Sequence, residues 1–286
     1  MAHSAATFHL GFAGSSIRSS PFHPGRFAVA AAANFGIVGN GKLSVVVQAA
    51  DASLQCEAEL LTNDGLYDCA WSELHEHQVV GACGDGTIKL WDLQTANQHG
   101  GRPLASLHEH SAEVCGVDWN LVRKDCFASC SWDHTIKVWE PERLVLLATL
   151  TDHTSCVYEV KWHPSHPERL LSASGDRCVA SSYYGCTAPT YYQVSNPHLT
   201  WRRTVRLWEP RAGPSAQLTC AAGEQEVGST PPLECGREAT ALCIPGCNPV
   251  DRRLAATYAS QVLSVDWNKY DEHCFATGAV DKTVRL

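Results

Sequence analysis

The stretch from Ala82 to Asp92 decides the fold, and it reads Ala-Cys-Gly-Asp-Gly-Thr-Ile-Lys-Leu-Trp-Asp. The same pattern returns 48 positions later, from Cys130 to Glu140, as Cys-Ser-Trp-Asp-His-Thr-Ile-Lys-Val-Trp-Glu. In both copies an Asp stands in a turn, where it can hydrogen-bond the local backbone, and Thr-Ile then begins a run that suits a strand. A unit that recurs at a fixed period predicts small sheets that stack side by side and bury their faces against one another.

A short apolar strand that ends in Trp precedes each turn, and it occurs four times. The copies are Tyr67–Trp71, Cys115–Trp119, Tyr158–Trp162 and Leu263–Trp267, and the matching turns carry Asp85, Asp133, Asp176 and Asp281. Apolar residues that alternate over short spans bounded by turns indicate strands. These features resemble the four-stranded blade of a WD-repeat β-propeller. With an atypical first blade near Pro21–Val47, the sequence predicts an all-β, incomplete WD-repeat β-propeller of about five blades, where a closed ring in this family usually has seven.

Resemblance to the WD-repeat family implies a buried network that links a loop His, a strand Ser or Thr, the turn Asp and the last-strand Trp of a blade. Carried over by position, this pattern gives a structural role to Asp85, Trp91, His110, Ser129, Asp133, Trp139, His153, Ser172, Asp176, Trp208, Thr277 and Asp281. The second blade has Thr62 and Gly81 at the His and Ser positions, so its network is expected to be incomplete. A Ser-His-Asp set could also indicate a hydrolase, but a nucleophile is needed once and not once per blade. We therefore predict that the chain is not an enzyme.

Two segments interrupt the repeat. The spacing from Asp to Trp is 6 in the intact copies, from 85 to 91 and from 133 to 139, but it is 32 from Asp176 to Trp208. Residues 178–203 and 227–261 are therefore expected to be inserts, because removing both restores a period of 44 between Asp176 and Asp281. A hairpin loop as long as the first insert is uncommon in compact domains. We interpret both inserts as translated introns or gene-model errors, and two functional surface loops are the alternative.

The repeat also sets the expected domain boundaries. Residues 1–19 match no repeat, and a disordered N-terminal tail is expected there. The rest of the chain is expected to hold blades one to four in 20–177, a disordered insert in 178–203, the end of blade four and start of blade five in 204–226, a second disordered insert in 227–261, and a truncated fifth blade in 262–286.

Composition narrows the classes of function. The chain has 286 residues, of which 44% are hydrophobic and 18% are charged, and its formal net charge is −8. Such a chain offers no electrostatic footprint for nucleic acid, and no apolar run is long enough to insert into a membrane. Its 14 cysteines form no Cys-x-x-Cys pair, so we expect free thiols, a reducing compartment, no metal and no cofactor. Zinc at Cys235, Cys243 and Cys247 is a weaker alternative, because no further pair completes a four-ligand set.

Motifs outside the repeat narrow the family further. They are Ser20–Ala28, Asn34–Gly41, Asn63–Asp68, Ala112–Val114 and Trp267–Tyr270. Together they resemble the peroxin-7 family, WD-repeat receptors for the type-2 targeting signal of peroxisomal matrix proteins, over residues 20–286 apart from the two inserts. The resemblance implies a cytoplasmic receptor that shuttles to the peroxisome and does not itself insert into the membrane. A co-receptor peroxin and the peroxisomal docking complex are the further partners that it implies.

The same resemblance implies a peptide-binding site where the strand-connecting loops converge. The type-2 signal is a short helix with Arg near its start and His-Leu near its end, and a cationic amphipathic helix needs acidic side chains and an apolar groove. The candidates flank strand starts and Asp turns, and they are Asp64, Tyr67, Glu113, Trp132 and Tyr158. Another WD-repeat scaffold or substrate adaptor is one alternative function, and an inactive truncated product is the other.

Overall fold

The fold is that of a computed structural model. It describes residues 6–33, 39–96, 100–151, 153–176, 261–271, 274–280, 282 and 284–285, together with the backbone of 179–182, 203–208 and 216–222. Strands dominate these ranges, and the short segment α1 (Leu93–Ala96) is the one α-helix within them. No helix in the described ranges is both long and apolar enough to cross a membrane.

The first three sheets contain four strands each, and every strand pairs antiparallel with the next one along the chain. The first sheet holds β1 (Ala13–Ser19), β2 (Arg26–Ala32), β3 (Gly41–Gln48) and β4 (Leu54–Thr62). The second holds β5 (Leu66–Trp71), β6 (Gln78–Cys83), β7 (Ile88–Asp92) and β8 (Ala105–Leu107). The third holds β9 (Val114–Trp119), β10 (Phe127–Ser131), β11 (Ile136–Glu140) and β12 (Val145–Leu150).

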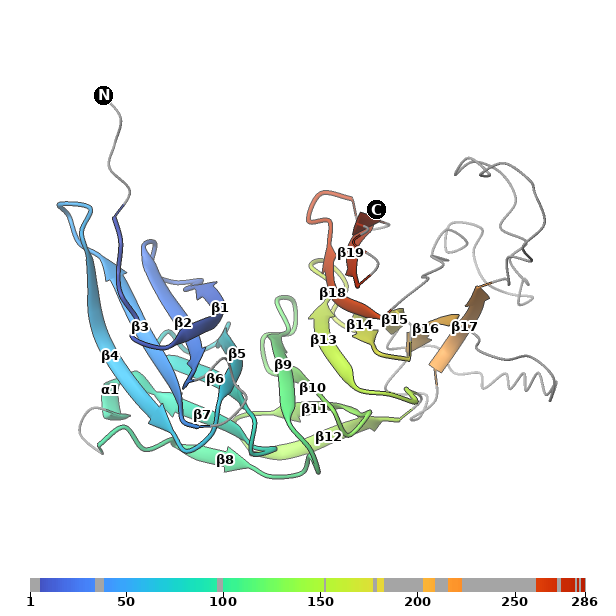
Figure 1. The fold of residues 1–286 in the computed structure, drawn as a ribbon, viewed down its shortest axis with the longest axis horizontal. Coiled ribbons are helices and arrows are strands. Elements are labelled where there is room, and N and C mark those ends of the chain that lie inside the picture. The colour runs from blue at the N-terminus through green and yellow to red at the C-terminus, as the bar shows by residue number, and fades with distance from the viewer. Residues whose placement is uncertain are drawn as a thin grey trace.

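Two further sheets complete the described strands. The fourth sheet holds β13 (Val157–Trp162), β14 (Leu170–Ser174), β15 (Val179–Ser182), β16 (Arg203–Trp208) and β17 (Ala216–Ala222). The fifth holds β18 (Val262–Trp267), β19 (Phe275–Ala279) and β20 (Val284–Arg285). Figure 1 shows the five sheets following one another in chain order around an open arc.

The inner strands of the arc are β1, β5, β9, β13 and β18, and each of the first four contacts the inner strand of the next sheet. Apolar clusters lie between consecutive sheets and not in one common centre. Strand β10 illustrates the reason, because Phe127 packs toward the second sheet while Ala128 and Cys130 pack toward the fourth. Side chains alternate across a strand, so a sheet between two neighbours buries both faces. The prediction of an all-β, incomplete propeller of about five blades is confirmed.

The expected disordered tail is wrong for its last residues, because Ala13–Ser19 form β1 and pair with β2. Two side-chain contacts also tie β1 to the second sheet. The Ser15 hydroxyl donates a hydrogen bond to the Leu66 carbonyl at 2.6 Å, and Trp71 Nε1 donates to the Arg18 carbonyl at 3.0 Å. The first blade therefore begins before Pro21, and backbone pairing forms its first strand where the sequence shows no apolar alternation.

The predicted connection from the Asp176 turn to the third strand of the fourth blade is also wrong. With residues 178–203 taken as an insert, the third strand of this blade is predicted to lie after residue 203, but the strand that pairs with β14 is β15, which lies within that insert. Strand β16 then pairs parallel with β15. The physical reason is chain proximity, because Val179–Ser182 follows the turn directly and closes a short hairpin at low entropic cost. Residues 183–202 and 227–260, which make up most of the expected inserts, lie outside the described residues.

Candidate functional site

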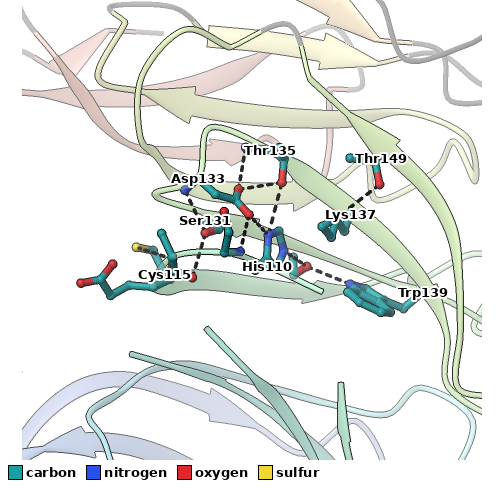
Figure 2. A network of polar contacts seen from close by, with 12 residues as sticks. His110, Cys115, Ser131, Asp133, Thr135, Lys137, Trp139 and Thr149 are labelled. Atoms are coloured by element: carbon teal, nitrogen blue, oxygen red, sulfur yellow. Dashed lines mark hydrogen bonds and ion pairs between the residues drawn. The ribbon is translucent and has the colours of Figure 1, made fainter. Parts of the chain in front are cut away.

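A chain of hydrogen bonds ties the third sheet together, and Figure 2 shows His110 between Asp133 and Trp139. His110 Nδ1 lies 2.8 Å from Asp133 Oδ2, and its Nε2 lies 2.8 Å from Ser129 Oγ. Trp139 Nε1 donates to the same Ser129 hydroxyl at 2.8 Å. The four side chains that the sequence assigned to this blade thus lie in one hydrogen-bonded series. Buried polar groups that are fully partnered in this way stabilise architecture.

Asp133 also shapes the turn between β10 and β11. Its Oδ1 accepts hydrogen bonds from the backbone N–H of Thr135 at 2.9 Å and from the Thr135 hydroxyl at 2.6 Å. Its Oδ2 accepts a third from the backbone N–H of Ser111 at 3.1 Å. Burial alone would raise the pKa of this carboxyl, but the hydrogen bonds from His110 and Thr135 outweigh burial and hold the pKa well below its ordinary 3.8.

We expect the ionised form of Asp133 to supply stability that is lost in acid. Folding lowers this pKa, so the unfolded chain binds the proton more tightly, and the free energy of unfolding falls as the pH drops below 3.8. The expected loss is on the order of 1–2 kcal/mol, comparable to one hydrogen bond to a charged group. Denaturant titrations at neutral and acidic pH should show a weaker pH dependence for Asp133→Asn than for the wild type. Parallel pH profiles of the two proteins would contradict this expectation.

The fourth sheet repeats the arrangement in its described part. His153 Nδ1 lies 2.8 Å from Asp176 Oδ2, and His153 Nε2 lies 2.9 Å from Ser172 Oγ. In the fifth sheet Thr277 lies buried on β19. The side chain of Trp208 and the whole of Asp281 lie outside the described residues.

In the second sheet the hydrogen bonds take another course. Trp91 Nε1 donates to the Gly101 carbonyl at 3.3 Å instead of to a side-chain hydroxyl. The cause lies at Gly81, which stands where the third sheet has Ser129. A Cβ at Gly81 would come within 2.9 Å of the Trp91 ring, so the indole fills the space that a serine would need.

Of the two roles that Asp133 has in the third sheet, shaping its turn and contacting a His, Asp85 has the turn role. Its Oδ1 accepts a hydrogen bond from the backbone N–H of Thr87 at 2.9 Å, and its Oδ2 forms an ion pair with Lys89 Nζ at 2.9 Å. Thr62, at the position that a His would occupy, donates its hydroxyl to the Asp64 carbonyl at 2.6 Å. The side chain of Asp85 thus acts within its own turn.

Carboxylates on the inner strands form a second set of contacts, which the sequence analysis missed. Each carboxylate accepts a hydrogen bond from a backbone N–H of the next inner strand, and we call these contacts the carboxylate clips. They join Asp68 on β5 to Val117 on β9 at 3.2 Å, Asp118 on β9 to Trp162 on β13 at 2.7 Å, and Glu159 on β13 to Val265 on β18 at 2.9 Å.

Basic side chains accompany the carboxylate clips. Arg18 of β1 pairs with Asp68 at 3.1 Å, and Lys161 Nζ lies 3.5 Å from both Asp118 and Glu159. Burial raises the pKa of Asp118, although Lys161 and the donated N–H act to lower it. Burial would lower the pKa of Lys161, but the negative charges of Asp118, Asp68 and Glu159 together outweigh burial and raise it. The clip at Asp118 is therefore a charged contact held in a largely enclosed place.

A cavity of about 630 Å³ lies along the inner strands. Residues 14–18 of β1 line one side, and the other inner strands contribute Tyr67, Cys115, Tyr158 and Leu263. These last four residues are equivalent, because each stands four positions before the Trp that ends its inner strand. The cavity thus opens at the starts of the inner strands, next to the Asp turns.

The five candidate peptide-binding residues gather at this end of the inner strands. Tyr67 and Tyr158 line the cavity. Asp64 and Glu113 precede β5 and β9, and Trp132, which is 41% exposed, donates its backbone N–H to the Glu113 carbonyl at 3.0 Å. Two acidic side chains and three aromatic rings therefore lie on one face of the arc, the face where the inner strands begin.

The two tyrosines lie in a partly enclosed and negative setting. Burial raises the pKa of Tyr67, and the carboxylates of Asp64 and Glu113 raise it further. Burial is also the main reason that the pKa of Tyr158 is raised. Both phenols are therefore neutral at physiological pH and present an aromatic face with a hydroxyl that can donate or accept.

The cysteines of the described part are free thiols. Burial raises the pKa of Cys69 to about 12 and that of Cys83 to about 11, so these thiols behave as apolar side chains. Across the described ranges, no group of three or more His, Cys, Asp or Glu side chains could hold a metal ion. Cys235, Cys243 and Cys247 lie outside the described residues.

Comparisons with known proteins match the repeat and the motifs. A family model described as WD domain, G-beta repeat matches residues 54–92, 101–140, 144–180 and 252–286, which is more than half of the chain. The chain is 46% identical over 134 residues to the peroxisomal targeting signal 2 receptor of Dictyostelium discoideum, covering 47% of this chain and 42% of that protein. It is 37% identical over 197 residues to the receptor of the same name in Saccharomyces cerevisiae, covering 59% and 52%.

A third relative is the human peroxisomal targeting signal 2 receptor, which is 40% identical over 155 residues, 54% of this chain and 46% of that protein. The chain spans about half the length of the curated relatives it matches. The resemblance to the peroxin-7 family that the sequence motifs indicated is confirmed by these relatives. With the matching family model and five sheets in chain order, the chain belongs to the WD-repeat family.

Proposed function

We propose that this chain acts as an import receptor that binds the N-terminal type-2 targeting signal of peroxisomal matrix proteins and delivers them to the peroxisome. The observation that carries the proposal is its likeness to several proteins named peroxisomal targeting signal 2 receptor. In this proposal the chain works from the cytoplasm, shuttles to the peroxisome, and acts together with a co-receptor peroxin and the docking complex. It has no catalytic role, because its repeated His, Ser and Asp side chains serve the blades.

The geometry at the starts of the inner strands supports a basic peptide as ligand. Among the described residues, the carboxylates of Asp64 and Glu113 take part in no ion pair, so they can receive cationic side chains. Trp132 exposes 41% of its surface beside Glu113, and an aromatic face of this kind can stack on a guanidinium. The negative net charge of −8 favours the same partner by steering a cationic peptide toward the surface.

We expect Glu113→Lys to weaken binding of a fluorescein-labelled type-2 signal peptide by more than about 1 kcal/mol, because it places a cation where the peptide needs an anion. Fluorescence anisotropy on the full chain measures the affinity. Glu142→Lys is the matched control, since Glu142 is 57% exposed in the β11–β12 connection at the other end of the strands, near His75. It makes the same change in net charge away from the candidate site.

Equal weakening by Glu113→Lys and Glu142→Lys would remove Glu113 from the binding site, because only the overall charge would then matter. A wild-type chain that binds the signal peptide no better than a scrambled peptide of the same composition would refute the proposed function. Each variant should keep the wild-type circular dichroism spectrum and thermal midpoint, which shows that a change in affinity is not caused by unfolding.

A further inference from the structure

In blades two to five, the same backbone hydrogen bond joins the Asp turn to the start of the inner strand. The residue before the turn Asp donates its N–H to the carbonyl two positions before the cavity-lining residue. The four contacts are Gly84 to Gly65 at 2.9 Å, Trp132 to Glu113 at 3.0 Å, Gly175 to Cys156 at 2.8 Å, and Val280 to Gln261 at 3.0 Å. Side chains at these positions can therefore be compared directly from blade to blade.

In the second and fourth blades a tyrosine lies against a glycine. A Cβ added to Gly84 would lie 3.3 Å from Cε2 of Tyr67, and a Cβ added to Gly175 would lie 3.3 Å from Cε2 of Tyr158. The glycine thus leaves room for the phenol ring to lie across the Asp turn. A larger residue at Gly84 or Gly175 would crowd that ring and the neighbouring Asp64 or Ser155 side chain.

In the third blade the large and the small residue exchange positions. Cys115 stands where its neighbours have tyrosine, and Trp132 stands where they have glycine. Cys115 lines the cavity and is partly exposed, as are the tyrosines on either side of it. The ring that the repeat pattern would place between Tyr67 and Tyr158 is therefore missing, and a small thiol takes its position.

We propose that Tyr67, Cys115 and Tyr158 form a slot that receives one aliphatic side chain of a bound amphipathic helix. This inference rests on the proposed function and names the contact that the apolar face of the signal peptide makes. Two phenol faces and a thiol offer an apolar surface along the cavity. Trp132, displaced to the rim, extends that surface beside the acidic Glu113.

The charged groups around the slot favour an aliphatic side chain over a cationic one. The charged groups deeper in the cavity already have partners, because Arg18 pairs with Asp68 at 3.1 Å and Glu159 accepts the Val265 N–H at 2.9 Å. A cation in the slot would lose water and gain no free carboxylate. The carboxylates without ion pairs, Asp64 and Glu113, lie at the rim, where they suit the basic face of the same helix.

The double variant Cys115→Tyr/Trp132→Gly tests the slot. It gives the third blade the tyrosine and glycine that its two neighbours carry at equivalent positions, so it fills the slot with a packing that the fold already uses twice. Trp132→Gly alone is the control, because it makes the same change at the rim and leaves the slot open. Each full-length protein is titrated with the fluorescein-labelled type-2 signal peptide, and its thermal midpoint is recorded.

We expect the double variant to bind at least about tenfold more weakly than Trp132→Gly. Equal affinity of a folded double variant and Trp132→Gly would overturn the slot. A peptide series covers the case of a misfolded double variant. Replacing each aliphatic residue of the peptide with alanine should cost the wild type about tenfold at one position, and a flat series would overturn the slot. Absence of any wild-type binding would instead refute the proposed function.

Discussion

Replacing Trp139 with alanine should lower the free energy of unfolding by about 3–5 kcal/mol, the usual cost of emptying a fully buried indole site. Trp139 is 1% exposed, stacks on Phe127 with ring centroids 6.3 Å apart, and donates its N–H to Ser129. Its removal leaves a cavity between the second and third sheets and takes one partner from the hydrogen-bonded series that includes His110. Equilibrium unfolding in denaturant measures the loss.

Trp132→Ala is the matched control for Trp139→Ala. It removes the same side chain from the same blade, but at a position that is 41% exposed, so its effect should be within about 0.5 kcal/mol. Similar losses for the two variants would show that burial in the blade interface is not what makes Trp139 important.

Asp118→Ala should cost about 3 kcal/mol of unfolding free energy, because it breaks a clip between the third and fourth sheets and takes one of two carboxylates from the enclosed Lys161. The Trp162 backbone N–H loses its acceptor at 2.7 Å, and Lys161 loses a carboxylate at 3.5 Å. Hydrogen exchange should then report faster opening at the β9–β13 contact, in addition to a lower denaturation midpoint.

The control for Asp118→Ala is Asp125→Ala. Asp125 is 51% exposed and pairs with Arg123 at 2.9 Å, a surface ion pair whose removal costs about 0–1 kcal/mol. If both aspartates gave the same small loss, the carboxylate clips would have no share in holding the blades together.

The parts of the fold that the sequence predicted are those fixed by local chemistry at a constant spacing. A turn Asp that binds backbone N–H groups two positions later must precede its strand by the same number of residues in every blade, as at Asp85 and Asp133. The hydrogen-bonded series in the third blade follows from the same regularity. The incomplete series in the second blade was readable from Thr62 and Gly81.

Long-range pairing explains what the sequence did not reveal. Strand β1 has small and polar residues without alternation, and its pairing with β2 is a property of the backbone. The sequence does not reveal the carboxylate clips, because the carboxylates do not share one position relative to the Trp that ends each inner strand. Asp68 and Glu159 stand three positions before the Trp that ends their strands, whereas Asp118 stands one position before its own. The slot has a readable signal, since Tyr67, Cys115 and Tyr158 share the offset of four.

The carboxylate clips bind main-chain amides, and every non-proline residue carries the same amide. One blade can therefore hold its neighbour without matching the neighbour's side chains. Residues of an inner strand that carry neither a clip carboxylate nor an apolar contact between sheets can change without loosening the clips, as long as the strand keeps its path and its amide hydrogen. Adhesion between blades and the choice of ligand are thereby separated, so that evolution or a protein engineer can rewrite one without rebuilding the other.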